Sequence, residues 1–202
     1  MNDNLQKSDH IVVPVMENRS FDNMLGWLYD PQNNALFDKV PRNQPFDGVS
    51  GKNLSNPIPE KVPGSEHKTI PVGKAVALNT PPFNPGETYS HINTQLFGTI
   101  IPPENKPPFR SPYNLPPELP ETYPMNGFVL DFAENLRYNK QPVRYENYKT
   151  IMDCFTPDRV PVISRLAHSY AVCDRWFCSV PTQTFPNRSF FHAATSSGFL
   201  SN

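Results

Sequence analysis

Cysteine is scarce in this sequence. Only three occur, Cys154, Cys173 and Cys178, and none of them forms a C-x-x-C motif. An odd number of cysteines without that spacing argues against a disulfide framework and against a thiolate zinc site. We therefore expect reduced cysteines in or near a hydrophobic core.

Long apolar runs and an excess of one charge are also missing. No stretch approaches the ~18 consecutive apolar residues of a membrane-spanning helix, and the N-terminal MNDNLQKSDH lacks the parts of a signal peptide. The 18 basic and 19 acidic residues give a formal net charge of −1. The sequence therefore has no excess of positive charge with which to bind nucleic acid. We expect a cytoplasmic protein with no membrane span and no nucleic-acid partner.

Proline, in contrast, is abundant, and it is concentrated in one part of the chain. There are 25 prolines among 202 residues, well above the usual share of about 5%. Many lie in residues 101–124, IPPENKPPFRSPYNLPPELPETYP, where they exclude helix and sheet interior. A disordered linker is one interpretation. Because aromatic residues accompany the prolines, we favour an ordered insertion or lid over about residues 81–124.

The rest of the sequence predicts an α/β fold. Residues 11–16, IVVPVM, are apolar on both faces and predict a buried parallel strand, although Pro14 cannot donate to a ladder. Ser20 or Asp22 could cap a helix that follows. The remaining periodicity predicts further elements. Helices are expected within residues 89–100, 125–139 and 161–169 and around 189–194, and strands near 70–79 and 170–173.

Two polar side chains follow the predicted first strand. Glu17 and Asn18 offer a carboxylate and a carboxamide oxygen, which are hard donors suited to a divalent cation. In parallel α/β sheets, ligands bind at the carboxyl ends of strands. An Asx-type turn or a helix cap is an equally simple interpretation of this pair.

A second candidate site is VPTQTFPNR, residues 180–188. Thr182 and Thr184 are hydroxyls in a loop that leads into a helix predicted to begin near Asn187. A helix N-terminus stabilises anions, and Arg188 can bind a phosphate through two parallel hydrogen bonds. A threonine hydroxyl could attack phosphorus if a metal lowered its pKa. A capping threonine beside a surface arginine is the alternative.

Taken together, these motifs resemble the phosphoesterase family that contains the non-specific phospholipases C and a group of bacterial acid phosphatases. The matching segments are ENRSFDNMLGWL, NPGETYSHINTQLFG, MNGF, AVCDRWFCSVPTQTFPNR and FFHAATSSG. They occur in this order between residues 17 and 198. The resemblance therefore covers nearly the whole chain.

The resemblance implies a fold, a reaction and residues for it. The fold would be similar to alkaline phosphatase, a largely parallel sheet flanked by helices. The family's metal-binding Glu-Asn pair falls on Glu17 and Asn18, and its nucleophile falls on Thr184, which also contacts the metal. Arg188 would offset charge on the phosphoryl oxygens. The implied activity is hydrolysis of a phospholipid or small phosphoester with a divalent cation, with contact to a membrane surface through a lipid substrate.

Two features depart from the family pattern. Where many members have a histidine in a DPGH-like motif, this sequence reads NPGE, with Glu87 in that place and His91 four residues later. Members are also considerably longer, and their further part supplies a second acidic pair of metal ligands. We therefore expect residues 1–202 to be the N-terminal part of one phosphoesterase domain. The alternative is an inactive truncated remnant or fragment that at most binds a ligand or partner.

Overall fold

The computed structural model describes residues 7, 9–30, 40, 45–98 and 123–202. Six α-helices occur in this part of the chain: α1 Phe21–Leu25, α2 Tyr89–Phe97, α3 Phe128–Tyr138, α4 Tyr145–Tyr148, α5 Pro161–Ser169 and α6 Thr184–Ala193. Two 3₁₀ helices, η2 Ser65–His67 and η3 Lys149–Met152, accompany them. The strands are short: β1 Ser55–Pro57, β2 Thr69–Pro71, β3 Gly73–Lys74 and β4 Asp153–Cys154.

The strands form two separate ladders. β1 and β2 pair antiparallel, with Asn56 opposite Ile70. β3 and β4 pair parallel, with Gly73 opposite Asp153. The fold is therefore mixed α/β, as the sequence predicts, but the described residues contain two two-stranded ladders and not the large parallel sheet that we expected.

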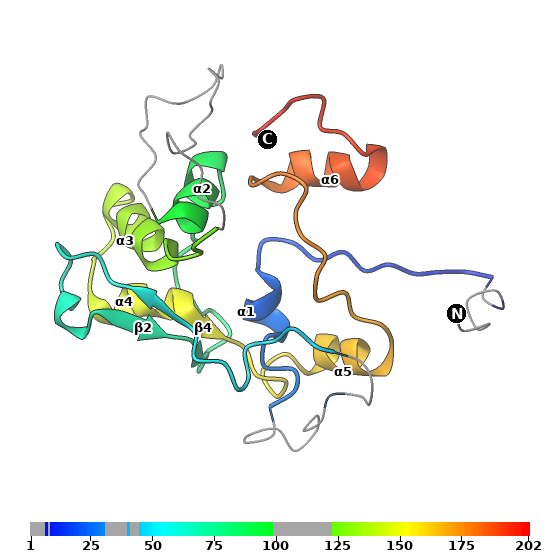
Figure 1. The fold of residues 1–202 in the computed structure, drawn as a ribbon, viewed down its shortest axis with the longest axis horizontal. Helices are drawn as coiled ribbons and strands as arrows, with labels where there is room; N and C mark the ends of the chain where they lie inside the picture. Colours follow the sequence, from blue (N-terminus) through cyan, green and yellow to red (C-terminus); the bar gives the residue numbers. More distant parts are fainter. Residues whose placement is uncertain (1–6, 8, 31–39, 41–44, 99–122) are drawn as a thin grey trace.

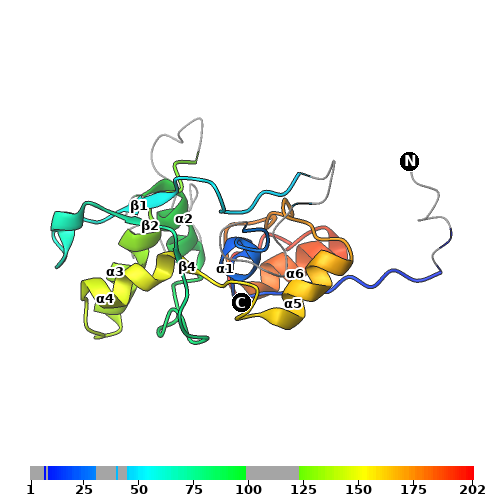
Figure 2. The same cartoon turned by 90° about the horizontal axis from the view of Figure 1, so that it is seen from below.

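The elements gather into two groups (Figures 1 and 2). One group contains α2, α3, α4 and the strands β1 to β4, and its core is built around α3. Phe132, Val129 and Leu136 of α3 are almost fully buried, as is Tyr148 of α4. These side chains repeat every three or four residues along α3, which places them on one helix face. The sequence periodicity correctly predicted this helix.

A buried asparagine joins the sheet of this group to α3. Asn56 of β1 is 1% exposed. Its Oδ1 accepts the backbone N–H of Val129 at 3.1 Å, and its Nδ2 donates to the carbonyl of Met125 at 3.0 Å. The first N–H groups of a helix have no partner within the helix. Asn56 supplies one of these partners, and this fixes how the start of α3 meets the sheet.

The second group contains α1 and α5 and has a smaller core, and α6 lies apart from that core (Figure 1). The buried residues of this core are Leu25, Leu28, Tyr29 and Ala167. Helix α1 connects the two groups, because Asn23 donates through Nδ2 to the carbonyl of Asp153, 2.9 Å away, and accepts the N–H of Phe155 at 2.7 Å. These bonds attach α1 to the end of β4.

A second contact between the groups is polar. The buried Asp30 carboxylate pairs with Lys74 of β3. The Lys74 ammonium also lies 4.7 Å from the centre of the Trp27 ring, and the indole N–H donates to the carbonyl of Gly73 at 3.1 Å. Burying a carboxylate is favourable only when it is paired, so this ion pair fixes β3 against the chain that follows α1.

The prediction of a buried strand at residues 11–16 is wrong. This segment forms no ladder with any described residue, and its side chains are exposed, with Val12 at 86%. Figure 1 shows it running away from the body of the molecule. Pro14 lacks a backbone N–H, and no strand in the described part of the chain lies beside this segment to pair with it.

Several other sequence predictions are confirmed. Ser20 caps α1, because its Oγ accepts the N–H of Asn23 at 3.1 Å, and α2, α3 and α5 lie within the predicted ranges. The strand predicted at 170–173 is not formed. Helix α6 begins at Thr184, several residues before the predicted start. Most of the insertion predicted at 81–124 lies outside the described residues. No helix in the described part of the chain is long and apolar enough to cross a bilayer.

Candidate functional site

The turn before α1 carries the first two candidate residues. Glu17 and Asn18 are exposed, and Asn18 has a φ of +67°, in the left-handed region. Asparagine tolerates this conformation better than most residues. The two side chains therefore lie at a sharp bend and not at the end of a strand.

Arg19 attaches this turn to the rest of the molecule. Its Nη1 donates to the carbonyl of Thr80 at 2.6 Å and to Oδ1 of Asn23 at 3.0 Å. Its guanidinium also lies 5.3 Å from the centre of the Phe155 ring, which adds a cation–π contact. The sequence analysis did not single out Arg19. The residue next to the candidate pair Glu17 and Asn18 thus holds the turn in place.

The start of α6 carries the other two candidates. Thr184 is the first residue of the helix, and Arg188 follows four residues later on the same face. Thr182 differs from Thr184 in its surroundings: it is 8% exposed, and its hydroxyl donates to the carbonyl of Leu200 at 2.6 Å. Thr184 is only half-buried. Burial and bonding therefore distinguish Thr182 from Thr184, the residue on which the family resemblance places the nucleophile.

The structure brings all four candidate residues together. Oγ1 of Thr184 donates to Oδ1 of Asn18 at 3.4 Å, and Nε of Arg188 donates to Oε2 of Glu17 at 2.8 Å. The hydrogen bond and charge of Arg188 lower the pKa of the Glu17 carboxyl. The same contact raises the pKa of the guanidinium. Glu17 is thus held ionised, with a threonine hydroxyl close by.

His91, whose role the sequence left open, belongs to a different cluster. Its Nδ1 lies 2.6 Å from Oδ1 of the buried Asp131, and Oδ2 of Asp131 accepts Nε2 of Gln95 at 2.8 Å. Gln95 also donates to the carbonyl of Gly86 at 2.9 Å. A Cβ at Gly86 would lie 2.1 Å from the His91 ring, so only glycine fits in this NPGE turn. Glu87 is exposed.

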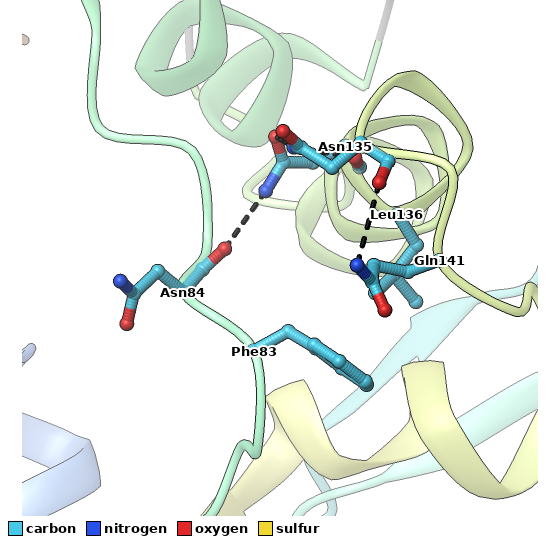
Figure 3. Close-up of a pocket in the computed structure, with 6 residues that line it drawn as sticks. Phe83, Asn84, Asn135, Leu136 and Gln141 are labelled. Atoms are coloured by element: carbon cyan, nitrogen blue, oxygen red, sulfur yellow. Dashed lines mark hydrogen bonds between the residues drawn. The ribbon is translucent and has the colours of Figure 1, made fainter.

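The structure also contains a hollow beside α3 (Figure 3). Its volume is about 260 Å³. Asn135 donates to the carbonyl of Asn84 at 2.8 Å across its rim. The lining residues are Phe83, Asn84, Asn135, Leu136, Asn139 and Gln141. None of the four candidate residues lines this hollow.

One of the three cysteines is in the core, and the other two are on the surface. Cys154 is buried, which raises the pKa of its thiol to about 12, whereas Cys173 and Cys178 are exposed. All three are free. Within the described residues, no group of three or more His, Cys, Asp or Glu side chains is placed to hold a metal. The candidate metal ligands here are oxygen donors from Glu17, Asn18 and Thr184.

Comparison with known proteins defines the class of this chain. The sequence profile of the Phosphoesterase family matches residues 8–201, and the chain belongs to that family. It is similar to three plant proteins of Arabidopsis thaliana: non-specific phospholipase C3 at 39% identity, C1 at 36% and C4 at 34%. Each alignment covers 95% of this chain, but only 30%, 28% and 30% of the respective relative. The chain therefore spans less than a third of the length of these relatives.

The His91–Asp131 pair predicts how stability depends on pH. The hydrogen bond to Asp131 raises the pKa of His91 above its usual value near 6.5. A raised pKa means that the folded state holds the proton more tightly than the unfolded chain does. The stabilisation is therefore fully present below about pH 6.5 and is lost as the pH rises through the folded-state pKa.

Denaturant unfolding from pH 5 to 9 tests this expectation. The free energy of unfolding of the wild type should exceed that of His91→Gln most at low pH, and the difference should shrink as the pH rises. Asp131→Asn should remove the same pH dependence. His10→Gln, at an exposed position near the N-terminus, is the matched control. A difference between wild type and His91→Gln that is constant with pH would contradict the raised pKa.

Proposed function

We propose that the protein to which this chain belongs hydrolyses phosphoric ester bonds, with Thr184 as the nucleophile. The observation that carries the proposal is the meeting of Thr184 with Asn18 and of Arg188 with Glu17. Family membership and the names of the relatives support the reaction class. The substrate is a phospholipid or a small phosphoester, and a lipid substrate would bring the site to a membrane surface. For the complete domain we propose the largely parallel, alkaline-phosphatase-like sheet.

The position of Thr184 suits a nucleophile that acquires negative charge. The N-terminus of a helix carries a partial positive charge, which stabilises an anion within the first turn. Thr184 is the first residue of the ten-residue helix α6. Its hydroxyl is not committed to a backbone carbonyl, whereas the hydroxyl of Thr182 is. We therefore assign the nucleophile to Thr184 and a structural role to Thr182.

The donor set fits a divalent metal ion. Glu17, Asn18 and Thr184 would hold it through a carboxylate, a carboxamide and a hydroxyl oxygen, which are ligands that hard cations prefer. The Arg188 hydrogen bond lowers the pKa of Glu17, so the carboxylate is ionised, and a cation would take the place of Arg188 beside it. When bound, the metal would supply Lewis-acid chemistry that lowers the pKa of the threonine hydroxyl.

Thr184, Arg188 and Glu17 would then each have a separate role in the reaction. The Thr184 hydroxyl gives up its proton to solvent, and its oxygen forms a bond to phosphorus as the bond from phosphorus to the ester oxygen breaks. The expelled alkoxide takes a proton from water and leaves as the alcohol. Water next attacks the phosphothreonine linkage, releases the phosphate product and regenerates the hydroxyl. Arg188, one turn further along α6, offsets the charge on the phosphoryl oxygens. A cation at Glu17 would compete for the carboxylate that pairs with Arg188 and so free the guanidinium for substrate.

Replacing Thr184 tests the nucleophile. Thr184→Ala in the complete protein should lower kcat by at least about 10³-fold, because covalent catalysis has no substitute group. The thermal unfolding curve should barely change, because this half-buried side chain contributes little to the core. Thr182→Ala is the matched control. It should lower the free energy of unfolding by about 1 kcal/mol through the lost hydrogen bond, with a much smaller effect on kcat.

The measurement is steady-state hydrolysis of phosphatidylcholine and of a chromogenic phosphomonoester. A larger loss of kcat in Thr182→Ala than in Thr184→Ala would move the nucleophile to Thr182. A complete protein that is folded and binds metal but turns over neither substrate would favour the alternative, a remnant that only binds a ligand or partner.

Replacing Glu17 tests the metal site. Glu17→Gln keeps the shape of the side chain but removes the charge that a divalent cation needs. Because Glu17 is exposed and outside the core, metal affinity should fall clearly while the unfolding temperature changes little. Isothermal titration calorimetry of the complete protein with Mg²⁺, Ca²⁺ and Zn²⁺ measures this, with the exposed Glu60→Gln as the control. Unchanged metal affinity in Glu17→Gln would show that Glu17 is not a metal ligand and that the turn at 17–18 has only a structural role.

A further inference from the structure

Asn187 is the most highly bonded side chain at the start of α6. Its Nδ2 donates to three carbonyls of the preceding loop, those of Val180 and Thr182 at 3.0 Å and that of Gln183 at 3.1 Å. Its Oδ1 accepts the backbone N–H of Val180 at 3.2 Å. A carboxamide has two N–H donors and one acceptor oxygen. The two N–H groups of Asn187 are therefore shared among three carbonyls, and all of these contacts are made to the loop 180–183.

This loop has few other restraints. Pro181 has no backbone N–H, and among the described residues one backbone–backbone bond lies within the loop, from the N–H of Thr182 to the carbonyl of Val180 at 2.8 Å. The Thr182 hydroxyl adds one bond to Leu200, and Oε1 of Gln183 accepts the N–H of Asn202 at 3.2 Å. Pro186 is buried and fixes the first turn of the helix beyond the loop. Most of the hydrogen bonds that define the loop thus come from one side chain.

The bond to Gln183 bears directly on Thr184. The carbonyl of Gln183 and the N–H of Thr184 belong to the same planar peptide group. A fixed Gln183 carbonyl therefore fixes the orientation of this peptide plane, which ends at the Cα atom that carries the Thr184 side chain. The threonine hydroxyl is in turn only 3.4 Å from Oδ1 of Asn18, so a small rotation of this plane would separate the two groups.

We infer that Asn187 is a positioning residue that sets the Thr184 hydroxyl in its reactive place by clamping the loop 180–183. The inference rests on the proposed function, because it takes Thr184 as the nucleophile. Asn187 acts through the backbone and not on the substrate. A displacement of about 1 Å at a reacting atom can cost about 10²-fold in rate. Loss of the clamp should therefore affect the chemical step more than substrate binding.

Two variants of the complete protein test the clamp. Asn187→Ala removes all four hydrogen bonds. Asn187→Asp keeps the size of the side chain and one acceptor for the Val180 N–H, but it turns a carboxylate oxygen toward the three carbonyls. Asn147→Ala is the matched control. It removes a similar bond, from Nδ2 to the carbonyl of Pro142 at 2.8 Å, on helix α4 in the group of elements around α3.

Two readouts separate positioning from general stability. In steady-state kinetics with a chromogenic phosphoester, both Asn187 variants should lower kcat about 10- to 100-fold with little change in KM, the pattern of an interaction that matters in the transition state. In native-state hydrogen exchange, peptides covering 180–184 should exchange faster, whereas peptides covering α3 should not change. Asn147→Ala should keep wild-type values in both.

Each remaining outcome either overturns the positioning role of Asn187 or shows that the proposed function is wrong. Wild-type kcat in both Asn187 variants, or unchanged exchange of 180–184, would show that Asn187 does not position the nucleophile. Failure of both variants to fold would make Asn187 a structural residue and overturn the positioning role. A wild type that turns over no phosphoester would refute the proposed function. The clamp on the loop would then still be supported by faster exchange of 180–184 in Asn187→Ala.

Discussion

The candidate site depends on one long-range junction, the ion pair between Glu17 and Arg188. These residues are 171 positions apart, and the adjacent pair Asn18 and Thr184 is separated by 166. Both partners of the ion pair are solvent-exposed, and exposed ion pairs contribute little to stability on their own. The junction therefore relies on what holds its two sides: Arg19 on the N-terminal turn, and Asn187 on the loop before α6. Because each side of this ion pair is held by other contacts, Glu17 can release Arg188 and bind a ligand without unfolding of the site.

The sequence predicted the members of the site but not the way in which they are supported. Glu17, Asn18, Thr184 and Arg188 stand in two short motifs whose chemistry can be interpreted from residue types. Their meeting is consistent with the role inferred from the family resemblance, although that role stays a prediction. The contacts of Arg19 and Asn187 are with backbone carbonyls, and a carbonyl carries no residue-specific signal in a sequence. The family resemblance placed the nucleophile on Thr184, and the structure adds that Thr182 is buried and bonded to Leu200.

The fold was predictable where its determinants are local. Helix α3 follows from apolar residues spaced three and four apart, and the start of α1 follows from the Ser20 cap. Residues 11–16 were misjudged because a strand exists only with a neighbour, and apolar composition alone does not specify one. The start of α6 was placed too late because Pro186 looks like a helix boundary. Proline is compatible with the first turn, where its missing N–H would have no helical partner, and here it lies buried two residues after Thr184.

The most direct test of this account is to identify the atom that carries phosphate during turnover. The complete protein would be mixed with a phosphomonoester, quenched in acid at early times, digested and analysed by mass spectrometry. The account predicts a phosphorylated peptide whose modified residue is Thr184, formed before product accumulates and lost as substrate is exhausted. Phosphate on Thr182 or on any other residue, or rapid turnover with no covalent adduct at any time, would contradict it.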